Sequence, residues 1–257
     1  MNYLVFRLYG AMASWGEIAV GETRQSARYP SKSAITGLLA AALGIKRECD
    51  EKHLALVNGY QQAIKLVKTG QLLKDYHTAQ APDSVGKYSY QTRRDELLIG
   101  KDRIGTVLSS REYRTDAQAV VAIQAMDDAP YSVSELQQAL QTPKFHLYLG
   151  RKSCPLAAPL AAQIVAAAHF YDALNQYSLN RLLQSDRDWE SDKRYLPDDA
   201  RTHYYWEGSQ DDFAKESDVF CSSHIQIVQR HDKPMSRKRW QFQSRNESMW
   251  LHKKETS

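Results

Sequence analysis

Hydrophobic and polar positions in the first forty-five residues predict a strand followed by a helix. Residues 3–9 alternate between two sides with a period of two, as in a half-buried β-strand. A glycine-rich loop follows, and apolar residues then recur at helical spacing over 35–43. Ser31 or Ser33 is available as the N-cap of this helix, and Gly44 as its terminator.

The next eighty residues predict strands on either side of a long excursion. Residues 61–76 have the pattern of a strand or of a hairpin that turns at Thr69-Gly70. The stretch from about 78 to 110 is polar, contains glycine and proline and has little periodicity, so we expect it to leave the core. The apolar run within 117–125 then predicts a buried strand.

A second helix and a further strand follow. Ser132 and Glu135 have the spacing of a capping box, and Thr142-Pro143 ends the helix. Residues 145–149 predict the next strand. The order strand, helix, strand, excursion, strand, helix, strand is typical of a split βαβ, ferredoxin-like unit of the α+β class. We assign this unit to residues 1–149.

The remaining part, residues 150–257, has weaker patterns and predicts a smaller, β-rich C-terminal region. A helix is expected over about 160–174, followed by an acidic stretch with aromatic residues up to Asp218. A strand is expected over 224–228, and the chain ends in a basic tail.

Composition is that of an ordinary globular protein, with 42% hydrophobic and 25% charged residues among 257. No apolar run approaches the roughly 18 residues that a membrane-spanning helix needs. No signal peptide is visible, and the three cysteines are far apart, so we expect a cytoplasmic protein without a disulfide framework.

Charge is unevenly distributed along the chain. Residues 1–114 carry 17 basic and 11 acidic side chains, residues 115–228 carry 9 and 16, and residues 229–257 carry 8 and 3. Basic ends around an acidic centre suggest one surface that attracts a polyanion. An uneven scatter of charge over solvated faces is the alternative interpretation.

Two basic clusters could bind phosphate. The first lies at the start of the predicted helix, where backbone N–H groups attract anions, and comprises Arg24, Arg28, Lys32 and Ser33. The second is the loop Gly150, Arg151, Lys152 and Ser153, in which a glycine after a strand lets amides face outward. A capped helix with exposed arginines and a plain solvated turn are the structural alternatives.

A third cluster, Lys74, Tyr76 and His77, has residue types suited to catalysis. Tyrosine or histidine as general base, with lysine stabilising the developing charge, could cleave RNA through its own 2′-hydroxyl without a metal ion. The spacing is not distinctive, and packing or base stacking by these side chains is the competing interpretation.

Other chemical signals are weak, and we expect no cofactor and no metal site. Cys221 and His224 lack a second pair to complete a zinc site. Phosphate-loop, nucleophile-elbow and dinucleotide-binding motifs are absent. The basic run 237–240 could touch RNA phosphates or a protein partner, or form an exposed charged strand.

Several segments together resemble a known family. These are the opening strand with its loop 10–16, the run 21–33, the helix segment 37–45, Asp75 to Thr78, and Tyr148 to Leu156. In sequence, order and spacing they resemble the CasD subunits of type I-E CRISPR Cascade complexes, which belong to the RAMP superfamily. The resemblance covers about residues 1–160 and thins from 160 to 225.

The resemblance implies a ferredoxin-like RAMP fold with a protruding thumb at about 78–112. It implies a subunit that binds the 5′ handle of the crRNA and caps the CasC backbone filament beside the large CasA subunit, with target DNA reached through the complex. On that basis the expected RNA-binding residues are Arg24, Arg28, Lys32, Ser33, Tyr76, His77, Arg111, Arg114, Gly150, Arg151, Lys152 and Ser153. Arg93 and Arg94 lie on the same expected thumb.

The competing function is a metal-independent endoribonuclease that processes the repeat RNA. A homologous subunit in another CRISPR type uses tyrosine, lysine and histidine in this way, which would give Lys74, Tyr76 and His77 catalytic roles. In type I-E systems a separate subunit, CasE, cuts the RNA, so the resemblance favours a non-catalytic scaffold.

Overall fold

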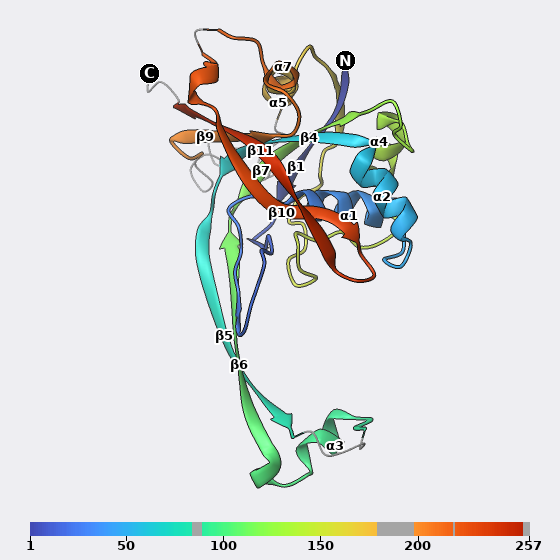
Figure 1. Ribbon diagram of the computed structural model, residues 1–257, viewed down its shortest axis with the longest axis vertical. Helices are drawn as coiled ribbons and strands as arrows, with labels where there is room; N and C mark the ends of the chain where they lie inside the picture. Colours follow the sequence, from blue (N-terminus) through green and yellow to red (C-terminus); the bar gives the residue numbers. More distant parts are fainter. Residues whose placement is uncertain (84–88, 179–197, 218, 254–257) are drawn as a thin grey trace, which may run out of the picture.

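A seven-stranded antiparallel sheet forms the body of the molecule, and a two-stranded ribbon projects from it (Figure 1). The computed structural model describes residues 1–83, 89–178, 198–217 and 219–253. The strand order in the sheet is β10-β11-β9-β4-β7-β1-β8. The strands are β1 (Asn2–Tyr9), β4 (Tyr60–Lys68), β7 (Gln118–Ala125), β8 (Gln163–Ala166), β9 (Arg201–Trp206), β10 (Gln226–Ser236) and β11 (Gln241–Lys253).

Helices cover both faces of this sheet. The first face packs against α1 (Lys32–Leu43), α2 (Asp50–Asn58) and α4 (Val133–Gln141), and the second against α5 (Phe170–Gln176) and α7 (Gln210–Phe213). Alternate side chains of β1 enter the two cores: Leu4 and Phe6 the first, Tyr3 and Val5 the second. The expected alternation of residues 3–9 is therefore present, but both of its sides are buried.

The two expected helices with capping signals are confirmed. The Ser31 hydroxyl caps α1 by accepting a hydrogen bond from the Ala34 amide, and Gly44 ends this helix in the left-handed conformation at φ 76°. Ser132 and Glu135 form the capping box of α4. The chain order strand, helix, strand, strand, helix, strand is also present, in β1, α1, β4, β7, α4 and β8.

The last strand of that order lies elsewhere than expected, because residues 145–149 form no strand. Their apolar pattern reflects packing on α1: the Phe145 amide donates to the Ala41 carbonyl, and Leu147 and Leu149 are buried in the first core. The helix expected over 160–174 is also wrong. Its first half pairs with β1 as β8, and only its end is helical, as α5. Pairing with an unpartnered strand edge overrides the helix propensity of alanine here.

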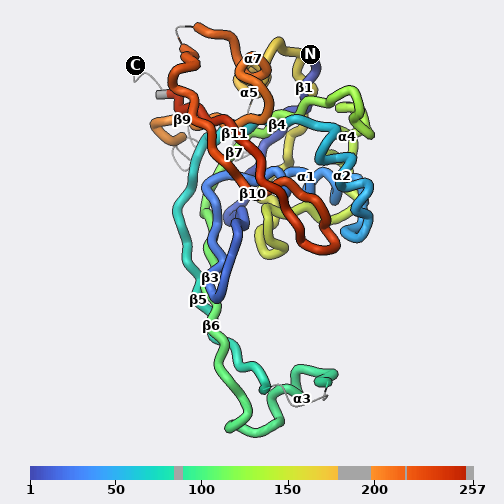
Figure 2. The backbone as a smooth tube through the Cα atoms, viewed as in Figure 1, coloured from blue at the N-terminus to red at the C-terminus, as the bar shows by residue number. Residues whose placement is uncertain are grey.

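The turn expected at Thr69-Gly70 is present, with Gly70 at φ 72°, but the strands on its two sides do not pair with each other. β4 stays in the sheet beside β7, whereas β5 (Gln71–Pro82) pairs with β6 (Ile104–Thr115) to form the ribbon. The ribbon ends in α3 (Arg93–Leu97) and the short helix η1 (Lys101–Arg103) (Figure 2).

The excursion expected at about 78–112 falls within this ribbon, which begins earlier and ends later. Its sequence lacks the alternation of a half-buried strand because both faces of most of the ribbon are exposed. Near the body, the ribbon is joined by β2 (Met12–Ala13) and β3 (Thr23–Arg24), which pair with β6.

The C-terminal strands continue the same sheet, since β9 pairs with β4 and with β11. The strand expected over 224–228 begins at 226 and is much longer, as β10. The β10–β11 hairpin lies over α1 and α2 (Figure 1). Residues 179–197, which hold much of the expected acidic stretch, lie outside the described part of the chain, and within that part no helix is both long and apolar enough to cross a membrane.

Candidate nucleic-acid interface

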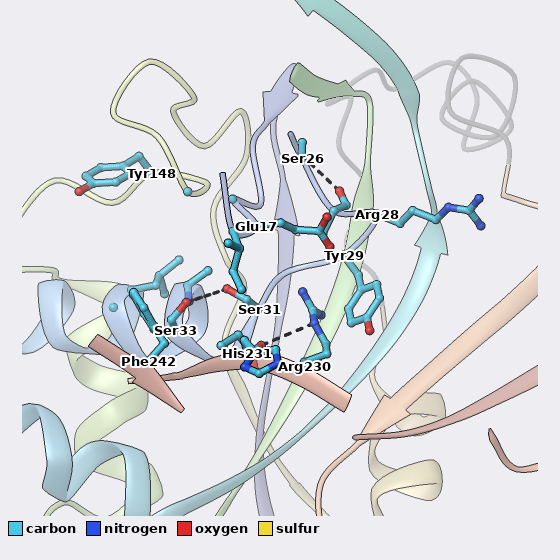
Figure 3. Close-up of a pocket in the computed structure, with 18 of the residues that line it drawn as sticks. Glu17, Ser26, Arg28, Tyr29, Ser31, Ser33, Tyr148, Arg230, His231 and Phe242 are labelled. Atoms are coloured by element: carbon cyan, nitrogen blue, oxygen red, sulfur yellow. Dashed lines mark hydrogen bonds and ion pairs between the residues drawn. The ribbon is translucent and has the colours of Figure 1, made fainter. Parts of the chain in front are cut away.

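A groove of about 940 Å³ lies where α1 begins, and segments far apart in the sequence line it (Figure 3). We call this cavity the groove. Its walls come from residues 16–18, 26–41, Arg114, 146–150, 228–232 and the hairpin turn with its flank. Of the expected RNA-binding residues, Arg28, Ser33, Arg114 and Gly150 line it.

The start of α1 is closed by the protein itself. The Lys32 amide donates to Oδ2 of Asp232 at 2.8 Å, and the Ser33 hydroxyl lies 2.9 Å from that of Ser31. The structure does not place the Lys32 side chain, an expected phosphate contact, in the groove: it is 6% exposed, and its Nζ lies 2.5 Å from a carboxylate oxygen of Glu207. A buried ammonium needs a carboxylate partner, and Glu207 supplies it.

This ion pair belongs to a buried network that fixes the β10–β11 hairpin to the body. Arg245 donates to Asp232 at 2.6 Å and to Glu247 at 2.5 Å. Glu247 in turn accepts a hydrogen bond from the Tyr29 hydroxyl at 2.5 Å. Burial raises the pKa of Asp232, but the hydrogen bonds and charge of Arg245 outweigh it and hold the pKa below its usual value.

Two arginines in the groove form no such ion pair. Arg28 is exposed and Arg114 is half-buried, and neither has a carboxylate within ion-pair distance among the described residues. Burial and the charge of Arg28 lower the pKa of Arg114 more than the nearby acids Glu112 and Glu17 raise it, so the two guanidinium groups repel each other. An anion between them would relieve that repulsion.

The expected loop at Gly150 has a mainly structural geometry. Gly150 has φ 83°, and a Cβ there would lie 1.8 Å from the Ser14 carbonyl oxygen, so only glycine fits. Arg151 donates to the carbonyls of Glu112 and Arg24, at 3.4 and 3.3 Å. Its guanidinium therefore ties neighbouring segments together, and the exposed Lys152 and Ser153 stay outside the groove lining.

Arg24 and Arg111 lie beside the groove on paired strands, β3 and β6. Both are exposed, and neither lines the groove. The Arg24 guanidinium donates to the carbonyl of Gly21 at 2.5 Å. The structure thus separates the first predicted cluster: Arg28 and Ser33 lie in the groove, Lys32 in the core and Arg24 on the surface nearby.

The three residues with catalytic potential do not converge. Lys74, Tyr76 and His77 are exposed on β5 of the ribbon, outside the groove. Successive side chains of a strand point to opposite faces, so His77 lies on the face opposite Lys74 and Tyr76. His77 instead contacts the Asp75 carboxylate, on its own face.

Several groove residues escaped the sequence analysis. They include Tyr148, His231 and Phe242, and the buried Arg230, whose guanidinium lies 4.4 Å from the Tyr29 ring. The run 237–240 was noted for its charge, and the structure places it at the turn of the β10–β11 hairpin. This run had a charge signal, and Tyr148 lies in a segment that carries the family resemblance, whereas the other residues are ordinary members of strands or loops until the fold assembles them.

Among the described residues, no group of three or more histidine, cysteine, aspartate and glutamate side chains could hold a metal ion. Cys221 contacts the Ser223 hydroxyl at 2.9 Å. Besides the acids Glu17 and Asp232, the groove offers guanidinium, hydroxyl and aromatic groups, which suit phosphates, hydroxyls and planar bases.

Comparison with known protein families shows which family has this sequence pattern. Residues 3–246 match the family described as CRISPR-associated protein (Cas_Cas5). The chain belongs to the Cas5 family. Within this family, the chain is 34% identical over 188 residues to the CRISPR system Cascade subunit CasD of Escherichia coli (strain K12), covering 68% of this chain and 77% of that subunit. The resemblance to CasD subunits in the sequence is thereby confirmed.

Solved structures share the fold. A chain of a CRISPR RNA-guided surveillance complex has a TM-score of 0.62 at 21% identity, covering 98% of this chain and 89% of that chain. A further Cas protein has a TM-score of 0.55 at 21% identity, covering 98% and 96% of the two chains. The Cas5 fold thus extends over nearly the whole length, including the C-terminal strands.

Proposed function

We propose that this protein is a non-catalytic, crRNA-binding subunit of a type I-E CRISPR Cascade complex and that the groove holds the 5′ handle of the crRNA. The observation that carries the proposal is the pair of guanidinium groups, Arg28 and Arg114, that line the groove of a Cas5-family chain without an ion-pair partner among the described residues. The relationship to the CasD subunit of E. coli Cascade supports the complex to which it would belong.

The chemistry of the groove suits a short single strand of RNA. Such a strand presents phosphates, 2′-hydroxyl groups and unstacked bases at once. Arg28 and Arg114 offer charge for a phosphate, Ser33 a hydroxyl, and Tyr148 an exposed ring. Arg24, Arg111, Lys152 and Ser153 lie outside the groove lining and would extend the contact along the strand.

We assign the remaining features of the chain on the same basis. The strand order β8-β1-β7-β4 with α1 and α4 on one face fits a ferredoxin-like RAMP unit, and the ribbon fits its thumb. Residues 1–149 with the ribbon would form this core and residues 150–257 the C-terminal region. The ribbon, carrying Tyr76, His77, Arg93 and Arg94, would lie over the guide and contact the CasC backbone subunit, with CasA adjacent and target DNA reached through the complex.

The geometry of the ribbon supports the non-catalytic part of the proposal. An attacking 2′-hydroxyl needs its general base and its charge-stabilising group within hydrogen-bond reach of one phosphate. His77 cannot share a face of β5 with Lys74 and Tyr76, so these three side chains do not form one site.

The salt dependence of RNA binding tests the role of the groove. Arg28→Ala and Arg114→Ala should each lower the slope of log affinity against log salt by about 0.7, the value per phosphate contact for a single strand. The probe is a labelled 5′-handle RNA titrated at several salt concentrations. Lys215→Ala removes an exposed charge beside α7, on the other face of the sheet, and serves as the matched control.

The control variant should keep the slope of the wild-type protein. Unchanged slopes in Arg28→Ala and Arg114→Ala, with tight binding by the wild-type protein, would move the phosphate contacts out of the groove. If the wild-type protein bound the 5′-handle RNA no more tightly than an unrelated RNA, the proposed function itself would be contradicted.

A further inference from the structure

An aromatic and cationic cluster lies at the end of the groove formed by the turn of the β10–β11 hairpin. It comprises Arg47, Arg237, Trp240 and Phe242. The two rings stack at 5.9 Å between centroids and 25° between planes. Phe242 lies on the α1 side of the groove and Arg28 on the opposite side (Figure 3), so this cluster is separate from the Arg28–Arg114 pair.

Both rings are unusually accessible for their size. Trp240 is 55% exposed and Phe242 is 37% exposed, although large aromatic side chains are mostly buried in folded proteins. Trp240 also has φ 52°, in the left-handed region that favours glycine and disfavours bulky residues. Glycine would adopt this backbone conformation without strain, whereas tryptophan adopts it at a cost in conformational energy.

The two arginines add positive charge to the cluster. Their guanidinium carbons lie 4.0 Å (Arg47) and 4.9 Å (Arg237) from the Trp240 ring centroid. Neither has a carboxylate within ion-pair distance among the described residues, and the buried Nε of Arg237 has no hydrogen-bond partner. Burial and the charge of Arg47 lower the pKa of Arg237, as expected for an uncompensated cation.

The turn is held rigidly in this arrangement by Asp50 at the start of α2. Its carboxylate accepts hydrogen bonds from the Ser236 hydroxyl at 2.6 Å and from the amides of Arg237 and Lys238 at 2.8 and 3.2 Å. This carboxylate is engaged by the turn and forms no ion pair with Arg47 or Arg237. Asp50 is therefore a positioning residue that pre-organises the cluster.

We propose that Arg47, Arg237, Trp240 and Phe242 form a binding site for one unpaired nucleotide of single-stranded RNA, with its base on the exposed rings and its phosphate on the guanidinium groups. Exposed rings beside uncompensated arginines in a basic groove are the features of single-strand binding sites. The inference rests on the proposed function and deepens it, because it gives the second end of the groove a defined ligand.

The test uses two pairs of variants and a labelled 5′-handle RNA. Trp240→Gly removes the ring and suits the backbone conformation, so the variant should fold, whereas Trp240→Phe keeps a ring. Trp240→Gly should weaken binding by about 5- to 150-fold, the range for loss of one base–aromatic stack, and Trp240→Phe by much less. Arg237→Ala should weaken binding and reduce its salt slope, whereas Lys215→Ala, which removes an exposed charge on the other face of the sheet, should not.

A set of RNAs, each with one abasic nucleotide, separates stacking from general weakening. At one position, removing the base should weaken binding to the wild-type protein. The same removal should not weaken binding to Trp240→Gly any further, because the base and the ring are partners in one contact. Wild-type affinity in both Trp240→Gly and Arg237→Ala would overturn the inference and leave the proposed function standing. Normal RNA binding by these variants, together with loss of their assembly into the complex, would also overturn the inference, because the cluster would then be a protein contact. A wild-type protein that binds no RNA would overturn both.

Discussion

At the scale of single residues, Asp232 occupies a position that anions take at other helix N-termini. Its carboxylate accepts the Lys32 amide at the start of α1 and two hydrogen bonds from Arg245. A phosphate at that position would have to displace a buried acid that accepts three hydrogen bonds. The anion-binding capacity of the groove therefore lies with its uncompensated arginines and not with the helix amides.

The contribution of the Asp232 carboxylate to the stability of the fold should depend on pH. Its pKa is lower in the folded protein than in the unfolded chain, so it stabilises the fold above the unfolded value of about 3.9. This stability is lost as the pH falls through that value towards the folded pKa. Asp232→Asn should lower the free energy of unfolding at pH 7 by about 3–5 kcal/mol, because it leaves Arg245 underpaired in a buried site.

The measurement is urea unfolding of both proteins between pH 3 and pH 7. The gap in unfolding free energy should narrow below about pH 4. Asp127→Asn, at an exposed position, is the control and should unfold like the wild-type protein at every pH. A gap that stays constant with pH would mean that the charge of Asp232 has no part in stability.

The sequence predicts the contacts of a single residue only where the partner residue is close in the chain. The Ser31 cap and the Gly44 terminator are local, and both are as predicted. The burial of the Lys32 side chain was not predictable, because its partner, Glu207, lies 175 residues away. A basic residue at a helix start looks the same in sequence whether it faces solvent or a distant buried acid.

At the scale of elements, the ribbon belongs to a second sheet, with β2 and β3, and its outer part adds little to the core. Its strands pair with each other as far as Pro82 and Ile104, and most of their side chains are exposed on both faces. Removing its outer part should therefore leave the body folded.

A trimmed variant tests this account of the ribbon. Gln80 and Thr106 are partners in register, so residues 81–105 can be replaced by Asn-Gly, which favours a two-residue hairpin turn. The thermal midpoint should stay within a few degrees and handle binding should persist, whereas assembly with the backbone subunit should fail. Assembly as efficient as that of the intact chain would contradict the role proposed for the ribbon.

Element prediction succeeded where a local pattern coincided with a capping signal, as in α1 and α4. It failed at 145–149 and 160–166, where the same apolar content could pack on a helix or pair with a strand. The outcome was decided by the unpartnered edge of β1, which accepted Gln163–Ala166 as β8. Such a choice depends on the assembled sheet and is not encoded in a short window of sequence.

At the scale of the whole molecule, the groove draws its residues chiefly from the two basic parts of the chain. The β10–β11 hairpin brings residues 228–242 over the start of α1, and Arg114 and residues 146–150 close the groove. The uneven charge along the sequence suggested a surface for a polyanion. Its location was not predictable, because the hairpin and its network, from Asp232 to Glu247, form only in the folded sheet.

The central claim, that the groove holds the crRNA handle without cutting it, is tested most directly by one assay. Purified protein is incubated with end-labelled repeat RNA in EDTA, and binding and cleavage are followed in a single turnover. We expect retained binding to the 5′ handle and no cleavage. A discrete cut that disappears when the 2′-hydroxyl at the scissile position is removed would contradict the claim and make Tyr76 and His77 the first residues to replace.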